Sequence, residues 1–571
     1  MAKGAEKKNA VVEPPEIIKL RMSHALYNAS MLGFYKVLVH KAKSDNDDEA
    51  QSMLNEDHGM ELWFPPRLLQ GIEEAWIDEM IDEFGKATKC SDMLDRYEAL
   101  RGAVQRGEGD AKAARELFGA VKDKMKSASY KSAAEICAAA GDTYNASEAL
   151  KAVEKPSKAD AETLFNALKL VIEYIERNKR VFMMKDIAYA VINKYWQNVA
   201  FLNRQTTKID MQKCIFDTFV EPALRAAAEP QKKEYECFEC GRTIGKKNMM
   251  FATAWLCDFG IDETRKSSNY RDFRPDDRAC PICALCYSCM PLGFQVIGAQ
   301  GFFINNNESF AMLKSANSSD GETVKVGTGS PSDFRRHIAR KYLSICSAKQ
   351  ANKQLSSIQA IIRKQESNNT PEYVIQILSG PQMRALTECK NEFDKLTNAY
   401  ITEGKTIRSV FDEALNNLML MRSQNSLIFK LLGTRLANGE RLYDARALLK
   451  IQVYSKGGCD MKKKDAGYFS RTDMAMLEGS RVRAMFDASE GDIDNKLRGY
   501  IYKLLNCAKG DDREGFMDTV ARFYIGMGRA MPSEMLSKMF QGQEAFVTLA
   551  QAYIIGLGGG WGSNEKGQDK E

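Results

Sequence analysis

The stretch ACPICALCYSCMP (279–291) contains four cysteines at a constant spacing of three residues. Cys280 and Cys283 form a CxxC pair, and Cys286 and Cys289 continue the same spacing. Taken alone, the pattern suits metal ligands, an iron–sulfur cluster, a disulfide set or the sulfur-rich face of a helix. The remainder of the chain has to distinguish between these interpretations.

A second CxxC pair, Cys237 and Cys240, lies upstream in CFEC, and Gly241 follows it directly. Each pair can present two thiolates to one tetrahedral Zn²⁺, because a tight turn brings both sulfurs to the same side. Glycine suits the unusual backbone angle of such a turn. The connection between the pairs is longer than the roughly 15–20 residues of compact ribbons. Cys237, Cys240, Cys280 and Cys283 are therefore predicted to hold a structural Zn²⁺, in a closed site without an open position for substrate.

An iron–sulfur cluster is the competing interpretation of the cysteines. Bacterial ferredoxins use the run CxxCxxCxxxCP, whereas the third spacing here is two residues and CFEC would have no role. A helix that leaves the second pair would carry Cys286 and Cys289 into the interior, where free cysteine behaves as a small apolar residue. We interpret these two as core residues, with a minor role as alternative ligands.

Composition limits the class of protein. The 571 residues suggest about three or four modules, and 44% hydrophobic with 27% charged residues is typical of a soluble globular chain. The sequence contains no run of roughly 18 apolar residues, so it predicts no membrane span. The N-terminus lacks the apolar region of a signal peptide. We expect a cytoplasmic protein, whose 14 cysteines are metal ligands or core residues rather than disulfides.

Signatures of catalysis are missing from the sequence. It contains no GxxxxGK[ST], no HExxH and no GxSxG in a strand–helix context. The four histidines are far apart in the chain, at His24, His40, His58 and His337. We therefore predict a binding or architectural protein rather than an enzyme.

Hydrophobic periodicity predicts a mainly α fold. Apolar residues recur at helical spacing from Ile17 to Lys43 and from Leu69 to Phe84, while MELWFPP (60–66) is typical of a short strand ended by prolines. We expect a helical N-terminal region with minor β structure, a zinc-ribbon-like α+β middle region and a C-terminal helical bundle. The predicted segments are a disordered lead-in (1–15), the helical N-terminal region (16–230), a zinc-knuckle module with DNA-facing loops (231–345), a helical connector (346–413), the C-terminal bundle (414–557) and a flexible tail (558–571).

Net charge is only +5, so any nucleic-acid surface has to be a local patch. The stretch from Phe334 to Gln365 has no acidic residue, and its pattern predicts helices of one charge sign that bind phosphate. A solvated helix face is the alternative. The basic residues that we single out as DNA-binding candidates in this stretch are Arg335, Arg336, Arg340 and Lys341. Further candidates are Lys246 and Lys247 after the first cysteine pair, and Arg265, Lys266, Arg271 and Arg274 in the connection between the two cysteine pairs.

Three asparagines follow an apolar, strand-like run in GFFINNNES (301–309), namely Asn305, Asn306 and Asn307. Their amides can donate to and accept from base edges, and in the minor groove they can separate A·T from G·C pairs coarsely. An ordinary turn is the alternative, because asparagine is a favoured turn residue.

The order of these features resembles the large subunit of type I CRISPR Cascade complexes, of the zinc-containing subtype I-B kind. The resemblance covers most of residues 16–557, although Cys286 and Cys289 are not part of the pattern of that family. It rests on CFEC, CPICAL, GFFINNN, LLNCAKGDDREGFMDTVARFYIGMG (504–528) and QAYIIGL (551–557).

The resemblance implies a subunit that recognises the PAM beside the target, starts opening of double-stranded DNA and docks a helicase-nuclease without cutting DNA itself. Guide RNA pairing would read the sequence, and protein would read the PAM and backbone. Implied partners are the guide RNA and the backbone and guide-processing subunits. The C-terminal domain is similar to a separate small subunit, which some relatives make from an internal start; Met419 and Met421 lie where such a product could begin.

For the asparagine segment, the resemblance implies a loop that contacts the PAM, held downstream of the zinc knuckles. A stand-alone zinc-ribbon DNA-binding regulator is the alternative function.

Overall fold

The computed structural model of the chain describes most of its length. The described residues are 11–12, 15–151, 153, 159–196, 210–229, 231–232, 235–245, 278–297, 300–318, 337–338, 341, 358–365, 371–377, 382, 385–386, 388–403, 406–440, 442–455, 471–487, 493–526, 528–531, 539 and 542–560.

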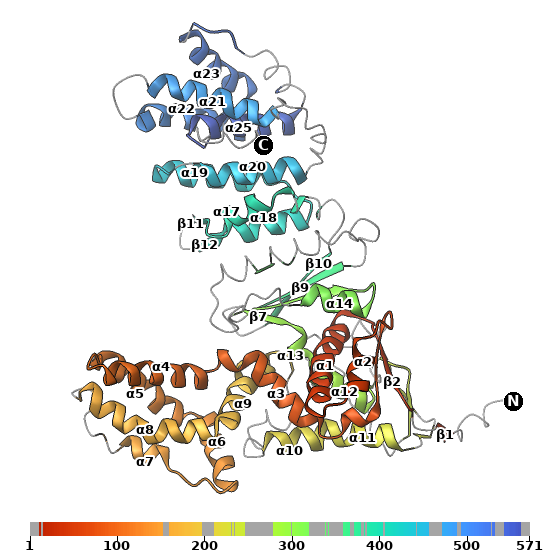
Figure 1. The fold of residues 1–571 in the computed structure, drawn as a ribbon. Helices are drawn as coiled ribbons and strands as arrows, with labels where there is room; N and C mark the ends of the chain where they lie inside the picture. Colours follow the sequence, from red (N-terminus) through yellow and green to blue (C-terminus); the bar gives the residue numbers. More distant parts are fainter. Residues whose placement is uncertain are drawn as a thin grey trace, which may run out of the picture. The chain divides into compact units, whose positions relative to one another are not determined.

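The fold is mainly α with small sheets, as the sequence predicts (Figure 1). The chain divides into two compact units. The first unit comprises Met1–Ser330 and Ser357–Ile375, and the second comprises Pro331–Ser356 and Gln376–Glu571. The boundaries of the six segments drawn from the sequence stay a prediction.

In the first unit, strand β2 (Ile18–Arg21) pairs antiparallel with β3 (Glu61–Phe64). The helix expected from residue 17 therefore starts later, because Ile18 and Leu20 alternate with exposed residues and pack as a strand. The strand expected within 60–66 is confirmed as β3. The helices around this pair are α1 (Ala25–Ser44), α2 (Asp48–Asn55) and α3 (Ile72–Phe84).

A group of helices in the first unit packs around its own apolar core. Side chains of Thr88, Asp110, Ser127 and Asp160 cap the N-termini of four of these helices by accepting backbone N–H bonds. The helices are α4 (Lys89–Gln105), α5 (Ala111–Lys126), α6 (Ala128–Ala139), α7 (Ala146–Lys151), α8 (Ala161–Arg177) and α9 (Lys179–Ala190).

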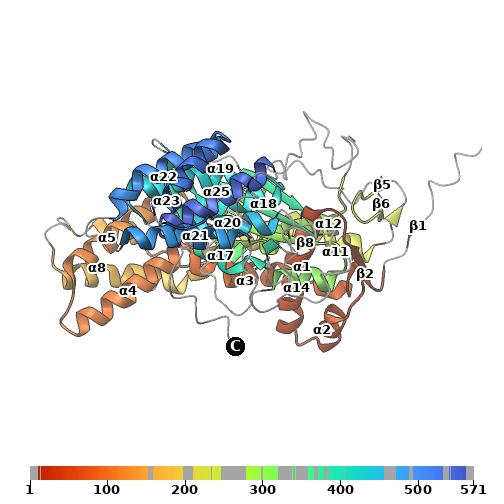
Figure 2. The ribbon, with the colours of Figure 1, turned by 90° about the horizontal axis from the view of Figure 1, so that it is seen from above.

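Helices from the middle of the chain pack against α1. Helix α12 (Pro281–Ser288) contacts both α1 and α11 (Glu221–Ala228), and α13 (Met290–Gly293) lies against α1. This approach is close, since a Cβ atom at Gly33 would overlap the carbonyl oxygen of Cys289. Figure 2 shows the hairpin β5–β6 near α12. The remaining elements here are α10 (Met211–Ile215), the π-helix η6 (Phe216–Val220), the pair β1 (Val11–Val12) and β4 (Gln231–Lys232), and the pair β5 (Tyr235–Glu236) and β6 (Thr243–Ile244).

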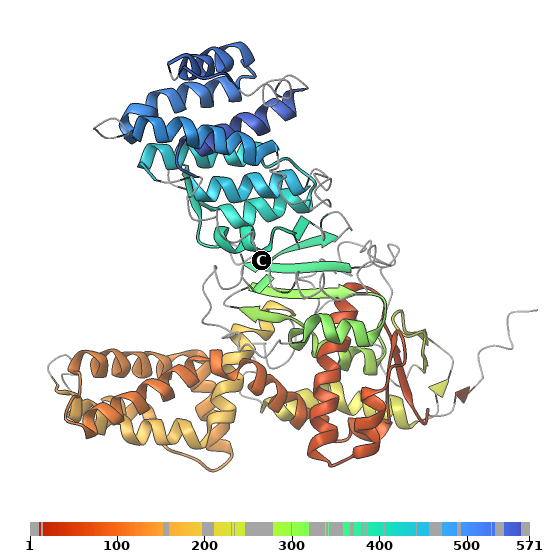
Figure 3. The same cartoon turned by 45° about the horizontal axis from the view of Figure 1, so that its top comes forward.

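A four-stranded sheet follows, in the order β10-β9-β8-β7 (Figure 3). Strand β8 is antiparallel to both β7 and β9, and its last residues are Asn305 and Asn306, so the expected asparagine loop is partly a strand. The bounds are β7 (Gln295–Ile297), β8 (Gln300–Asn306), β9 (Ile358–Gln365) and β10 (Pro371–Ile377), with α14 (Phe310–Asn317) after β8.

The sequence interpretation was wrong for part of the stretch 334–365 and of the connector 346–413. Residues 358–365 form β9 rather than a helix. Strand β10 and the hairpin of β11 (Tyr400–Glu403) and β12 (Thr406–Ser409) also fall within the expected helical connector. The cause is tertiary context, because Ala360, Ile361 and Ile362 are all buried, as in an inner strand that packs on both faces.

The second unit is largely helical, as its sequence pattern predicts. Helices α21 and α25 approach closely, since a Cβ atom at Gly556 would overlap the carbonyl oxygen of Met476. The elements are α17 (Lys390–Leu396), β11 (Tyr400–Glu403), β12 (Thr406–Ser409), α18 (Val410–Met419), α19 (Asn425–Asn438), α20 (Tyr443–Ser455), α21 (Arg471–Asp487), α22 (Ile493–Lys509), α23 (Arg513–Gly526) and α25 (Gln543–Leu557). None of the described helices combines the length and apolar character needed to cross a membrane.

Candidate metal centre and the adjoining asparagine network

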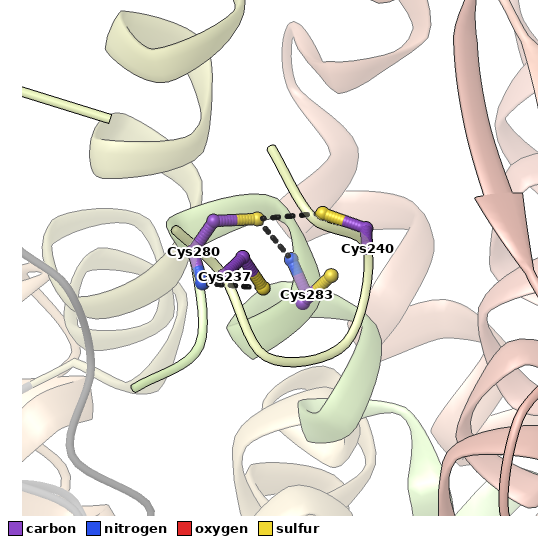
Figure 4. Close-up of side chains that lie close together, drawn as sticks. All are labelled: Cys237, Cys240, Cys280 and Cys283. Atoms are coloured by element: carbon purple, nitrogen blue, oxygen red, sulfur yellow. Dashed lines mark hydrogen bonds between the residues drawn. The ribbon is translucent and has the colours of Figure 1, made fainter. Parts of the chain in front are cut away.

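The four predicted ligands meet at one point. The sulfur atoms of Cys237, Cys240, Cys280 and Cys283 all lie within 4.8 Å of one another, and Figure 4 shows them between a tight turn and the start of α12. The turn is closed by a hydrogen bond of 2.9 Å from the Gly241 N–H to the Cys237 carbonyl. Gly241 has φ of +66°, the left-handed conformation expected at this position.

The spacing of the sulfurs suits a tetrahedral metal ion. A tetrahedron with Zn–S bonds of roughly 2.3 Å has sulfurs about 3.8 Å apart, and the Sγ atoms of Cys240 and Cys280 are 3.7 Å apart. Backbone N–H groups donate to sulfur as well: that of Cys280 to Cys237 Sγ at 3.2 Å, and that of Cys283 to Cys280 Sγ at 3.4 Å. Cys280 is the N-cap of α12, where the helix dipole favours a thiolate.

The pKa values of the four cysteine thiols are also shifted by their close approach. Hydrogen bonds from Cys237, and then from Cys280 and Cys283, lower the pKa of Cys240. Burial, followed by its sulfur neighbours, raises the pKa of Cys283 well above the ordinary value. The pKa values of Cys237 and Cys240 are thus lowered and those of Cys280 and Cys283 raised, and a bound dication would favour the thiolate form of all four. With four protein ligands, the centre would be closed and structural.

Cys286 and Cys289 stand apart from the metal centre. Both are fully buried, on α12 and directly after it, and the Cys289 thiol donates to the Leu285 carbonyl at 3.5 Å. Burial raises the pKa of both thiols. Their interpretation as core residues is confirmed.

Tyr27 of α1 touches the metal centre directly. Its hydroxyl lies 3.0 Å from Cys283 Sγ, and burial, followed by the nearby thiolate charges, raises the pKa of this phenol. The phenol therefore stays protonated and can donate to the sulfur. Sequence reasoning missed Tyr27, because no local pattern connects it with a cysteine far along the chain.

Glu239, between the two ligands of CFEC, fastens the turn to other elements. Its side chain is 2% exposed. Its carboxylate accepts a hydrogen bond of 3.0 Å from the Ser23 hydroxyl, lies 2.9 Å from His24 Nε2 and accepts a further bond from the Tyr287 hydroxyl. The turn is thus tied to the residues that precede α1 and to α12.

A network of amide side chains continues from Ser23. The Ser23 backbone N–H donates to Asn28 Oδ1 at 2.8 Å, and Asn28 Nδ2 donates to the Oδ1 atoms of Asn305 and Asn307, both at 2.8 Å. Asn305 Nδ2 in turn donates to Gln359 Oε1 at 3.1 Å. Asn28 is completely buried and was also missed from the sequence, where one asparagine in a helix gives no signal.

The candidates for DNA contact have varied positions. Asn305 and Asn306 are buried, and Asn306 Oδ1 accepts from the Glu308 N–H at 3.0 Å, whereas Asn307 is half-buried. Lys341, a candidate for phosphate contact, is only 2% exposed. Contact of these residues with DNA stays a prediction. The other basic candidates lie outside the described residues: Lys246, Lys247, Arg265, Lys266, Arg271, Arg274, Arg335, Arg336 and Arg340.

A second group of metal-ligating side chains lies between α1 and α3. His40 Nδ1 is 3.2 Å from Glu79 and 3.9 Å from Asp82, while Lys36 pairs with Glu83 at 3.0 Å. Since Lys36 and His40 on α1 face acidic residues on α3, we interpret this group as an ion pair and hydrogen bonds between the helices.

Comparison with known proteins agrees with the position of the metal centre. Residues 230–295 match the model of a family described as CRISPR-associated protein (Cas_CXXC_CXXC), and this segment contains both cysteine pairs. No curated protein and no solved structure matches the chain. The family match supports a CRISPR-associated protein with a role in CRISPR defence.

Proposed function

We propose that the chain is the non-catalytic large subunit of a type I, subtype I-B-like, CRISPR Cascade complex. In this role it recognises the PAM, helps to open the target double-stranded DNA and docks the helicase-nuclease. The observation that carries the proposal is the CRISPR-associated family match over the segment that forms the four-cysteine centre. The feature order from CFEC to the C-terminal helices supports the finer assignment.

The metal of the centre is Zn²⁺ in this proposal, held by Cys237, Cys240, Cys280 and Cys283. Bound there, it supplies a covalent-like cross-link between two distant chain segments rather than a reactive group. Its four ligands hold the CFEC turn against α12. The Glu239 carboxylate in this turn contacts the Ser23 hydroxyl and the His24 ring, and so connects the turn to the residues before α1.

The DNA-facing part of the proposal rests on the asparagine segment. Asn307 follows β8 and is held by Asn28, whose neighbour in the network, Ser23, is bound to the zinc turn. A segment held in this way loses little conformational freedom when it contacts a base edge. Basic residues at Arg335, Arg336 and Arg340 would add contacts to phosphate.

The C-terminal helices would act like a small subunit that lines the path of the DNA strands. Helix α18 ends at Met419, and α19 begins at Asn425. A product that starts at Met421 would therefore contain α19 and the helices after it, without α18. Guide RNA, backbone subunits and the guide-processing subunit are the further partners in this proposal.

Purification of the tagged chain from cells that carry a repeat–spacer array tests the assignment. We expect the chain to bring down a guide RNA of uniform length together with the backbone subunits. The alternative function, a stand-alone zinc-ribbon regulator, predicts instead a chain that purifies without RNA and binds a defined duplex by itself.

A further inference from the structure

The orientation of the amide network is determined by the two backbone groups of Ser23, because its carbonyl accepts from Asn28 Nδ2 at 3.4 Å while its N–H donates to the other amide atom. The Ser23 N–H can only donate, so the Asn28 atom that lies 2.8 Å from it is the acceptor Oδ1. Asn28 therefore directs Nδ2 at its other neighbours, and those neighbours, Asn305 and Asn307, direct their oxygens toward it. Asn28 is completely buried, and a buried amide has to find its hydrogen-bond partners within the protein.

The same order of donors and acceptors continues along the network to its last residues. Asn305 uses its oxygen on Asn28 and so directs Nδ2 at Gln359 Oε1, its cross-strand neighbour on β9. The groups left over are the amino groups Asn307 Nδ2 and Gln359 Nε2. Both residues are half-buried, and within the described part of the chain neither amino group has a hydrogen-bond partner. The network thus ends in two donors.

We propose that Asn28 sets the polarity of the amide network, so that Asn307 and Gln359 present hydrogen-bond donors to acceptor atoms on the minor-groove edge of an A·T pair in the PAM. The proposal rests on the proposed function and adds a positioning residue to it. In the minor groove an A·T pair offers only acceptors, while a G·C pair adds the guanine amino donor. Two outward donors therefore favour A·T and oppose guanine.

Asn28→Asp reverses the polarity with almost no change in shape. One carboxylate oxygen still accepts from the Ser23 N–H, but the other can no longer donate. Asn305 and Asn307 then have to turn their amides over to donate to it, and Gln359 follows, so that the network ends in acceptors. Mildly alkaline buffer keeps the introduced carboxyl ionised.

The test measures binding of the assembled complex to PAM-bearing duplexes, with adenine in the PAM either unchanged or replaced by 2,6-diaminopurine, which adds a minor-groove donor. For the natural chain we expect the replacement to weaken binding about tenfold. For Asn28→Asp we expect weaker binding to the unmodified duplex and a preference for the modified one. Zinc content and complex assembly are measured on the same samples.

Asn307→Asp is the second variant, and it keeps the inner contact because its carboxylate still accepts from Asn28. It should lose the preference for unmodified adenine even if Asn28→Asp does not assemble. Matched Asn307→Ala should show a smaller preference for the unmodified duplex than the natural chain, because Gln359 still presents its donor. An Asn28→Asp complex that assembles and keeps the natural preference overturns the inference, as does equal weakening on PAM-bearing and PAM-less DNA, which indicates phosphate contact. A PAM without an A·T pair overturns it too. Failure of the proposed function is distinct, because the natural complex would then show no PAM dependence.

Discussion

The hydroxyl of Tyr27 lies 3.0 Å from the Sγ atom of Cys283, across a sequence separation of 256 residues. This contact joins the first long helix to the candidate zinc centre. A phenol that donates to a metal-bound thiolate withdraws charge from the sulfur and holds it in place.

Tyr27→Phe removes that hydrogen bond and keeps the aromatic packing against Tyr287, whose ring centroid is 5.4 Å away. We expect zinc affinity to fall about tenfold, in the range typical of outer-shell partners of metal ligands. Competition with a chromogenic chelator measures the change. Tyr35→Phe, on the same helix but with its hydroxyl bonded to Asn55, is the matched control, and unchanged affinity in Tyr27→Phe would contradict a role at the centre.

Cysteine substitutions should separate the two halves of the opening stretch. Cys283→Ser removes a ligand, and we expect loss of stoichiometric zinc together with a lower unfolding temperature, because the metal is part of the folded structure. Cys286→Ala, one helical turn further along α12, should retain zinc and lose stability through a small buried cavity. Elemental analysis of the purified chains decides between them: zinc loss in Cys286→Ala would place that residue among the ligands.

Asp186 should be the most sensitive carboxylate among the helices α4–α9. It accepts bonds from the Cys90 N–H at 2.9 Å and the Tyr130 hydroxyl at 3.2 Å, and pairs with Lys124 at 2.6 Å. Asp186→Ala leaves buried donors unmatched, so we expect a loss of about 3–5 kcal/mol in the free energy of unfolding. Denaturant unfolding measures it, with Asp92→Ala at an exposed pair as the control; equal small effects would refute the assignment.

Replacement of Lys185 should raise the free energy of unfolding, in contrast to replacement of Asp186, and this gain should depend on pH. Burial lowers the pKa of this lysine from 10.5 to about 8. Because the folded pKa lies below the unfolded value, the protonated lysine destabilises the fold at pH values below about 8, and this cost fades as pH rises toward 10.5. Lys185→Met should therefore unfold at higher denaturant concentration than the natural chain at neutral pH, with a gap that narrows at alkaline pH. A gap that widens with pH would contradict this reasoning.

The sequence was sufficient where function depends on local spacing. Each CxxC pair specifies its own turn, and two pairs in a chain with few histidines specify the ligands, so Cys237, Cys240, Cys280 and Cys283 were predicted. Tyr27, Glu239 and Asn28 were not, because their contacts with the centre and the network exist only after distant segments have packed. For residues 358–365 the sequence pattern predicts a helix, whereas pairing with β8 makes this segment strand β9.

The most direct test of the central claim is the affinity of the assembled, guide-loaded complex for two duplexes that differ only in the PAM, measured with and without this chain. The proposed function predicts at least about tenfold tighter binding to the PAM-bearing duplex, and loss of that difference when the chain is omitted. A complex that distinguishes the duplexes equally well without the chain, or not at all with it, would contradict the claim.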